Sequence, residues 1–340
     1  MRDLDRARRW VVTCMFVIAP PLACATRPAP APAPVINDFD VPQMMAKRAS
    51  LPQDPNRVAL GRLLFHDPRL SKSSEVSCNS CHTLTRFGID GKTSATALEQ
   101  DSGRRNVPSV FNAATHVAQF WDGRALTVET QASEAMTNPV EMAMPNEKAV
   151  VDVISRVPRY VEMFHAAFPS DHQPISLHNV GDAIGAFERG LVTESRWDRF
   201  MAGDHSALTT HEKRGLGVFM QRGCIVCHAG PQVGGTSLQR VGAVFPWPNQ
   251  ADTGRLKVTH FEPDRMVFKV PSLKNIEETG PYFHDGSTSS LETAIRLMAF
   301  HQLGIEITES EVHAIADWMR SMTGEADPAY IAAPQLPPAG

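Results

Sequence analysis

The 340-residue sequence has no cysteine outside a short N-terminal segment and two close pairs. Two of its six cysteines, Cys14 and Cys24, lie near the N-terminus, and the other four form Cys-x-x-Cys pairs: Cys78 with Cys81, and Cys224 with Cys227. No cysteine remains for a disulfide framework. A fold held together by disulfides is therefore excluded unless the two pairs supply it.

The sequence also lacks an excess of positive charge. Its 33 Lys and Arg residues stand against 37 Asp and Glu, which gives a formal net charge of −4. Removing residues 1–25, with four arginines and two aspartates, changes this charge to −6. Nucleic-acid binding selects for basic surfaces, so the composition argues against a nucleic-acid partner.

Residues 1–25 are typical of an export signal. Several arginines precede the apolar run Trp10 to Ala19, which is too short to span a membrane, and Ala23-Cys24-Ala25 is a small-x-small cleavage site. Cleavage after Ala25 and lipid attachment at Cys24 both remain open. The sequence thus predicts a periplasmic protein, in which residues 26–45 form a Pro/Ala-rich linker.

Both cysteine pairs are followed at once by histidine, in Cys78-Asn-Ser-Cys81-His82 and Cys224-Ile-Val-Cys227-His228. This is the attachment signature of covalently bound haem. A zinc ribbon would not need the adjacent histidine twice, and a thioredoxin-like redox pair would need a βαβ context. We therefore predict two c-type haems, with His82 and His228 as iron ligands.

Segments that alternate polar and apolar residues are few, so we expect an all-α fold. A weak internal repeat supports two units. The pattern Gly-x-x-x-Phe precedes each haem motif, as Gly61 to Phe65 and Gly215 to Phe219, and a later helical segment recurs as Ala183 to Phe187 and Ala314 to Trp318. A glycine allows two helices to cross closely. We expect two cytochrome c-like haem domains in tandem, residues 46–205 and 206–326, and a Pro-rich tail, residues 327–340.

Helix capping signals mark two of the expected helices. Thr209 or Thr210 can begin a helix that runs to Arg222 and stops at Gly223. Ser289 or Ser290 can begin another that carries Met298. Methionine as the second axial ligand closes a haem iron and raises its potential, so Met298 is a candidate ligand of the second haem, although most methionines only fill cores.

Ten stretches of the sequence, the two haem motifs among them, resemble one known family, the bacterial di-haem cytochrome c peroxidases, which also include the MauG-type protein oxidases. The resemblance covers about residues 50–325. Besides the two haem motifs, its stretches are Leu64-Phe-His-Asp-Pro-Arg-Leu70, Arg105-Asn-Val-Pro-Ser109, Gln119-Phe-Trp-Asp-Gly-Arg-Ala125, Pro139-Val-Glu-Met142, Asp252-Thr-Gly-Arg255, Val270-Pro-Ser-Leu273, Pro281-Tyr-Phe-His284 and Gln302-Leu-Gly304.

The resemblance implies different roles for the two haems. The haem on His82 would react with peroxide, and the C-terminal haem, with Met298 as its sixth ligand, would accept electrons. Trp121 would lie between them. Gln131 and Glu141 would lie over the reactive iron, where cleavage of the O–O bond needs one proton removed from one oxygen and one delivered to the other. Pro139 favours a loop position for Glu141.

The resemblance also implies a calcium site between the two domains, formed by the side chain of Asn106 and the backbone carbonyls of Thr279 and Pro281. All three are oxygen donors, as a hard cation requires. His284 is expected near the second haem, at a propionate.

One position departs from the family pattern. Many members carry a histidine before the Arg-Asn-x-Pro stretch, which closes the peroxidatic iron until the other haem is reduced. Here that place falls at Leu98, and no histidine lies between His82 and His116. The hypothesis is an iron that is open or water-bound in the oxidised protein.

The main functional prediction is a peroxidase that reduces hydrogen peroxide with electrons from a small cytochrome c or a cupredoxin. A MauG-like oxidase of tyrosine or tryptophan in a partner protein is the alternative. The missing histidine favours it, and Met298 argues against it. A two-haem electron carrier is a third interpretation, in which Gln131 and Glu141 would be idle. Homodimer formation is left open.

Overall fold

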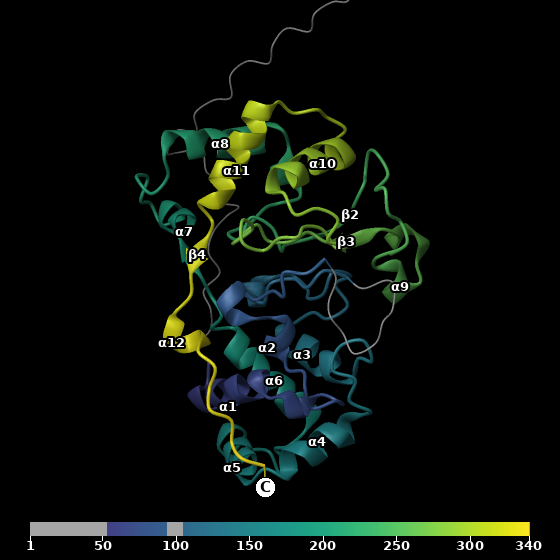
Figure 1. The fold of residues 1–340 in the computed structure, drawn as a ribbon, viewed down its shortest axis with the longest axis vertical. Helices are drawn as coiled ribbons and strands as arrows, with labels where there is room; N and C mark the ends of the chain where they lie inside the picture. The colour runs from purple at the N-terminus through teal and green to yellow at the C-terminus, as the bar shows by residue number, and fades with distance from the viewer. Residues whose placement is uncertain (1–52, 94–104, 340) are drawn as a thin grey trace, which may run out of the picture. The chain divides into compact units, whose positions relative to one another are not determined.

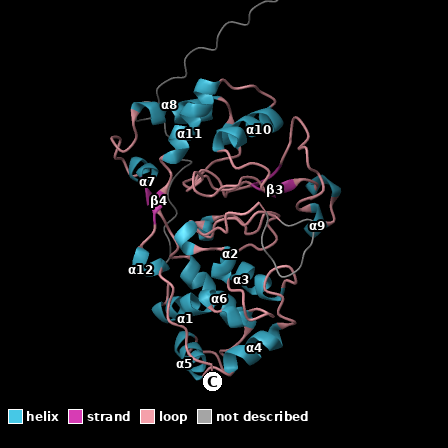
Figure 2. Cartoon of the chain, viewed as in Figure 1, coloured by secondary structure: helices cyan, strands magenta, loops and turns pink. Residues whose placement is uncertain are grey.

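Helices make up most of the regular structure in the computed structural model, which describes residues 53–93 and 105–339 (Figure 1, Figure 2). The predictions for the signal segment, the linker and Leu98 lie outside these residues. Among the described residues, strands form two small antiparallel sheets. One pairs β1 (Glu194–Ser195) with β4 (Gly324–Glu325), and the other pairs β2 (Leu238–Arg240) with β3 (Val267–Lys269). The prediction of a mainly helical chain is confirmed.

The longer helices, of six residues or more, are α1 (Pro55–His66), α3 (Val128–Thr137), α4 (Glu147–Ser155), α5 (Pro158–Ala167), α6 (Leu177–Glu188), α7 (Arg196–Met201), α8 (Thr210–Gln221), α10 (Leu291–Leu303) and α11 (Glu309–Arg320). Single turns form α2 (Cys78–Cys81), α9 (Leu256–Thr259) and α12 (Pro328–Ile331). No helix in the described parts is long and apolar enough to cross a membrane.

The first helix crossing joins α1 to α6. A Cβ atom on Gly61 would lie 1.8 Å from the carbonyl oxygen of Ala183, so only glycine permits this approach. The rings of Phe65 and Phe187 pack beside the crossing, with centroids 5.4 Å apart. Both side chains are fully buried in a first hydrophobic core.

The second crossing repeats this arrangement between α8 and α11. A Cβ atom on Gly215 would lie 1.9 Å from the carbonyl oxygen of Ala314, and the rings of Phe219 and Trp318 lie 4.7 Å apart. The two pairs predicted from the internal repeat therefore do cross at their glycines. The second crossing lies in a separate hydrophobic core, which also contains Trp197 of α7.

The capping residues expected from the sequence are found at the starts of α8 and α10, the helices that contribute to the site of the second haem motif. Thr209 caps α8 in a reciprocal hydrogen-bond arrangement with Glu212, and Gly223 follows the helix with a φ of 90°. Ser290 caps α10 by accepting a hydrogen bond from the backbone of Thr293. These caps fix where each helix begins, and so which residues face the site between them.

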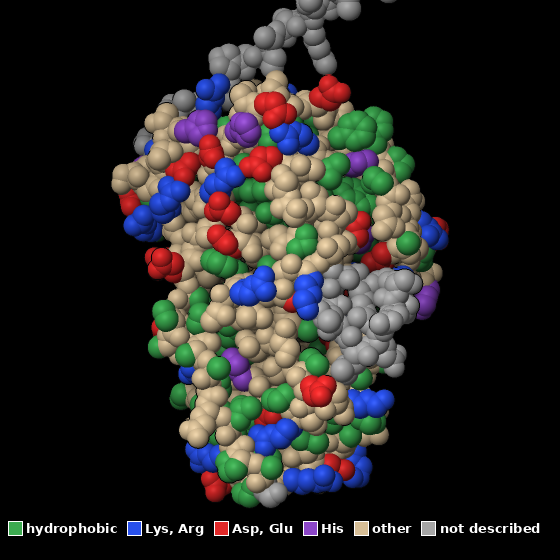
Figure 3. All heavy atoms as spheres, viewed as in Figure 1, with side chains coloured by type: hydrophobic (Ala, Val, Ile, Leu, Met, Phe, Trp, Pro, Cys, Tyr) green, Lys and Arg blue, Asp and Glu red, His purple; other side chains and the backbone are tan. Residues whose placement is uncertain are grey.

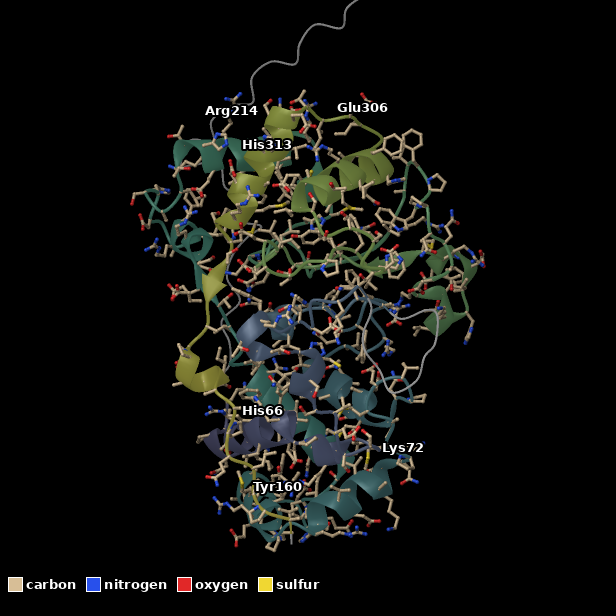
Figure 4. All side chains as sticks on the ribbon, viewed as in Figure 1. His66, Lys72, Tyr160, Arg214, Glu306 and His313 are labelled. Atoms are coloured by element: carbon tan, nitrogen blue, oxygen red, sulfur yellow. The ribbon has the colours of Figure 1, made fainter. Side chains whose placement is uncertain are left out.

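The C-terminal tail differs from the irregular segment expected from its prolines. It forms α12, and the Tyr330 ring stacks on Phe187 with centroids 5.1 Å apart. The Tyr330 hydroxyl donates to the carbonyl of Phe187 at 2.8 Å, and Arg62 donates to the carbonyls of Ala329 and Ala332. This ring contact and the hydrogen bonds to the three carbonyls hold the tail against the first core. Figure 4 labels Tyr160 of α5, which is part of the first core, and His66 of α1, whose ring meets that of Phe187 edge to face at 6.3 Å.

Candidate active site

The first haem motif forms the single turn α2. Ser77 and Ser80 cap this turn reciprocally, and His82 ends it. The Nδ1 atom of His82 lies 3.2 Å from the carbonyl oxygen of Gly88. That hydrogen bond places the ring proton on Nδ1 and leaves Nε2 for a metal. Burial lowers the pKa of His82, so the imidazole is in the neutral form that binds iron.

The second haem motif lies in the wall of a cavity. Cys224 to Val226 form a 3-10 turn, which begins after Gly223 with its positive φ. The cavity has a volume of about 240 Å³. Its walls bring together two thiols, an imidazole, a thioether and apolar side chains: Cys224, Cys227, His228, Met298, Leu291, Ile295 and Phe219.

This set of groups fits a c-type haem. The thiols can attach the ring, the imidazole and the thioether are both iron ligands, and the apolar walls suit the porphyrin. Burial lowers the pKa of His228 to about 4, which keeps it neutral and able to bind a metal. The predicted pairing of His228 with Met298 stays a prediction, but both residues line the same cavity.

Trp121 lies at the wall of that same cavity, although it belongs to the N-terminal half of the chain. Its indole N–H donates to the backbone carbonyl of Asn106 at 2.9 Å. The ring packs in a small cluster that includes Met298 and Phe268, and it meets the ring of His284 edge to face at 6.4 Å. Trp121 therefore contacts residues from both halves.

An ion-pair network beside Trp121 joins the two halves. Arg105 donates to Asp122 at 2.7 Å and to Asp252 at 2.6 Å. Burial opposes ionisation of Asp252, but the hydrogen bond and charge of Arg105 outweigh it and lower its pKa to about 2. The sequence reasoning missed this network. In the sequence, the only indication of the network is that Arg105, Asp122 and Asp252 all fall in stretches that resemble the family.

Glu141 lies in a turn after α3, as Pro139 predicted. Its Oε1 atom accepts hydrogen bonds from Asn138 at 2.6 Å and from Arg124 at 3.1 Å. Burial raises the pKa of Glu141, while the charge of Arg124 opposes this rise. The carboxylate is thus held in position by two donors.

Glu141 lies close enough to the first haem motif for their charges to interact. Burial raises the pKa of the Cys78 thiol, and the carboxylates of Glu188 and Glu141 raise it further. Gln131 lies on α3, one turn before Ala135, whose carbonyl accepts from the backbone of Met142. Gln131 and Glu141 thus lie on α3 and on the turn that follows it, and that Gln131 lies over the iron stays a prediction.

Comparisons with known proteins show which family the chain belongs to. A family model described as di-haem cytochrome c peroxidase matches residues 55–206. The cytochrome c551 peroxidase of Nitrosomonas europaea is 42% identical over 293 residues, which cover 86% of this chain and 86% of that one. The chain belongs to the di-haem cytochrome c peroxidase family.

The chain is also similar to MauG proteins. The methylamine utilization protein MauG of Methylorubrum extorquens is 34% identical over 311 residues, which cover 88% of this chain and 86% of that protein. A solved structure of a MauG-like protein associated with microbial copper homeostasis matches with a TM-score of 0.71 and 27% identity, over 87% of this chain and 97% of that one.

The residues predicted for calcium in this di-haem peroxidase chain lie at one cavity wall. Asn106, Thr279 and Pro281 all line the cavity of the second haem motif. The Nδ2 atom of Asn106 donates to the carbonyl of Lys92 at 2.9 Å, which leaves Oδ1 as the atom for a cation. The three donors are neutral oxygens, which suits calcium if water completes the shell. The calcium site remains a prediction.

Proposed function

We propose that this protein is a peroxidase that reduces hydrogen peroxide to water with electrons from a small cytochrome c or a cupredoxin. The observation that carries the proposal is the unequal surroundings of the two haem motifs. A positioned carboxylate, Glu141, lies near the first motif, and a thioether, Met298, lines the cavity of the second. An open iron suits peroxide, and a methionine-closed iron suits electron transfer.

The role proposed for Glu141 is to move a proton between the two peroxide oxygens. The haem on His82, when bound, supplies the iron that takes up peroxide and the electrons for its reduction. Glu141 starts as a carboxylate, accepts a proton from one oxygen and returns it to the oxygen that leaves as water. Arg124 and Asn138 hold the carboxylate in place, and Gln131 is proposed to orient the peroxide by its amide.

The proposed electron route enters the second half of the chain. Phe245 and Phe300 stack with centroids 4.6 Å apart, and each is 43% exposed. Phe300 lies on α10, the helix that carries Met298. Figure 3 shows hydrophobic side chains gathered on this face over the α10 region. An exposed apolar patch of this kind suits the docking of a small protein donor. Trp121 lines the cavity of the second haem motif, and we propose that it passes the electrons on to the first half of the chain.

We also propose the domain arrangement, the export and the calcium site that the sequence predicts. The two hydrophobic cores and their matching helix crossings support two cytochrome c-like domains in tandem. The N-terminal sequence supports export to the periplasm, with cleavage after Ala25 or a lipid anchor at Cys24. Asn106, Thr279 and Pro281 are proposed to bind calcium between the domains.

Replacing Met298 tests the proposed division of roles. In Met298→Leu the second haem loses its sulfur ligand, so donor-driven turnover should be abolished. Peroxide should still bind at the first haem, as a change in the absorption spectrum. Donor-driven turnover at the wild-type rate would contradict the assignment.

A MauG-like oxidation of a partner protein is the second candidate, since no histidine lies between His82 and His116 to close the first iron. An absorption spectrum of the oxidised protein tests this feature. Two six-coordinate low-spin haems would contradict an open iron. Equal peroxide consumption by fully oxidised and half-reduced protein would support it, and modification of a partner without a protein donor would favour the oxidase.

A further inference from the structure

Lys269 is a buried lysine in the wall of the cavity at the second haem motif. It is 6% exposed and lines the cavity together with Cys224 and His228. It ends β3, and its backbone N–H donates to the carbonyl of Trp121 at 2.7 Å. A buried ammonium group is costly unless an anion or several hydrogen bonds compensate it.

The surroundings of Lys269 in the described part of the chain supply only weak compensation. Its Nζ atom lies 3.4 Å from Nδ1 of His116. Asp122 acts on Lys269 through its charge, but both oxygens of Asp122 already accept hydrogen bonds from Arg105 and Arg124. Lys269 lines a cavity, and no carboxylate among the described residues forms an ion pair with it within hydrogen-bond distance.

His116 presents a second donor at the same wall. Lysine can only donate, so Nδ1 of His116 acts as the acceptor and the ring proton is assigned to Nε2. Burial, and then the charge of Lys269, hold the pKa of His116 well below its usual range, which keeps the ring neutral. The Nε2 atom is buried and has no hydrogen-bond partner among the described residues. His116 also lines the cavity.

We propose that Lys269 and His116 each bind one of the two carboxylates of the haem attached at Cys224 and Cys227. A c-type haem carries two propionate groups. One carboxylate can accept from the ammonium group and the other from the Nε2–H, which points away from the lysine. The proposal rests on the family's haem at the second motif, and it assigns these two residues to that haem. The backbone of Lys269 is hydrogen-bonded to the backbone of Trp121, the residue that is proposed to relay electrons.

The proposal has a consequence for the redox potential of the second haem. The reduced iron carries one positive charge less than the oxidised iron, so a cation fixed nearby stabilises the reduced state. Removing Lys269 takes away this cation and leaves the haem carboxylate without its counter-charge. The midpoint potential of the second haem should therefore fall.

An equilibrium redox titration of the haem-loaded protein tests this assignment. Lys269→Met should lower the midpoint potential of the methionine-ligated haem, and Lys269→Arg should restore most of it. Lys148→Met is the matched control, because Lys148 is 79% exposed on α4 and its loss changes the net charge equally. The absorption band of methionine-ligated ferric haem shows in each variant that the iron ligands are intact.

His116→Leu gives a second test that keeps the lysine. It should lower the potential by less than Lys269→Met, because it removes a neutral N–H donor and leaves the cation in place. A Lys269→Met potential equal to that of Lys148→Met, with ligation intact, would overturn the proposal. If Lys269→Met fails to load haem, an unchanged potential in His116→Leu overturns it instead. Absence of peroxide turnover would contradict the proposed function but would not affect this titration.

Discussion

The indole N–H of Trp121 donates a 2.9 Å hydrogen bond to the backbone carbonyl of Asn106, and the same ring packs in a cluster with Met298. This bond fixes the ring between the first half of the chain and the second cavity. Trp121→Phe keeps an aromatic ring but loses the bond and the indole. We expect donor-driven turnover to fall about tenfold or more, which corresponds to about 1.4 kcal/mol in the barrier.

Trp247→Phe is the control for that variant. Trp247 lies in the same cluster, and its indole donates to Asp285 instead of to the first half of the chain. Its replacement should change turnover much less. Equal rates for Trp121→Phe and wild type, measured by stopped-flow oxidation of the donor, would contradict a relay at Trp121.

Glu141→Gln removes the proposed proton carrier and keeps the shape of the side chain. We expect kcat for peroxide reduction to fall by about 10²- to 10⁴-fold, the usual contribution of general acid–base catalysis. Glu134→Gln is the matched control, because Glu134 also lies near Arg124 but is 42% exposed. If the two variants lost the same activity, the proton role would not belong to Glu141.

The pH dependence of the rate gives an independent view of Glu141. Burial raises the pKa of this carboxyl, and the protonated form cannot accept a proton from peroxide. In the wild type, kcat should therefore decline on the acid side, from a pH above the ordinary titration range of glutamate. The acid limb should be absent from the residual activity of Glu141→Gln, and its persistence would point to another group.

Asp252 should contribute to acid stability through its pairing with Arg105. Its pKa is lowered to about 2 from an ordinary value of 3.8, so the stabilisation is fully present above about pH 4 and is lost as the pH falls through about 2. This shift corresponds to about 2 kcal/mol of unfolding free energy. Denaturant unfolding of wild type and Asp252→Asn should differ at pH 6, and the difference should narrow toward pH 2. A constant difference would contradict the ion pair.

The helix crossings should not tolerate a methyl group. In Gly61→Ala and Gly215→Ala the new Cβ atom would lie 1.8 Å and 1.9 Å from a carbonyl oxygen of the opposing helix. Each helix pair must separate, which should cost about 1–3 kcal/mol or more in unfolding free energy. Chemical denaturation of each variant measures this cost. Unchanged stability would mean that the helices do not cross at these glycines.

The sequence predicted the parts of the molecule that depend on local chemistry. The spacing of Gly61 and Phe65 anticipated their crossing with α6, and Thr209 and Ser290 anticipated the starts of α8 and α10, because caps and close helix contacts need particular residue types. Both haem motifs were evident for the same reason.

The sequence did not predict contacts between distant charges. Arg105, Asp122 and Asp252 are ordinary charged residues in the chain, and only folding shows that they meet. The pairing of Lys269 with His116 also joins positions far apart in sequence. The order of the tail was missed because its prolines suggested an irregular segment, whereas a single ring, Tyr330, anchors it to Phe187.

The most direct test of the central claim counts the molecules of a reduced c-type cytochrome oxidised for each molecule of hydrogen peroxide that the haem-loaded protein consumes. The account predicts two, because two electrons reduce peroxide to water. It also predicts that this coupled reaction is lost in Met298→Leu and strongly slowed in Glu141→Gln. Peroxide consumption without oxidation of the cytochrome, or coupled turnover that neither variant alters, would contradict it.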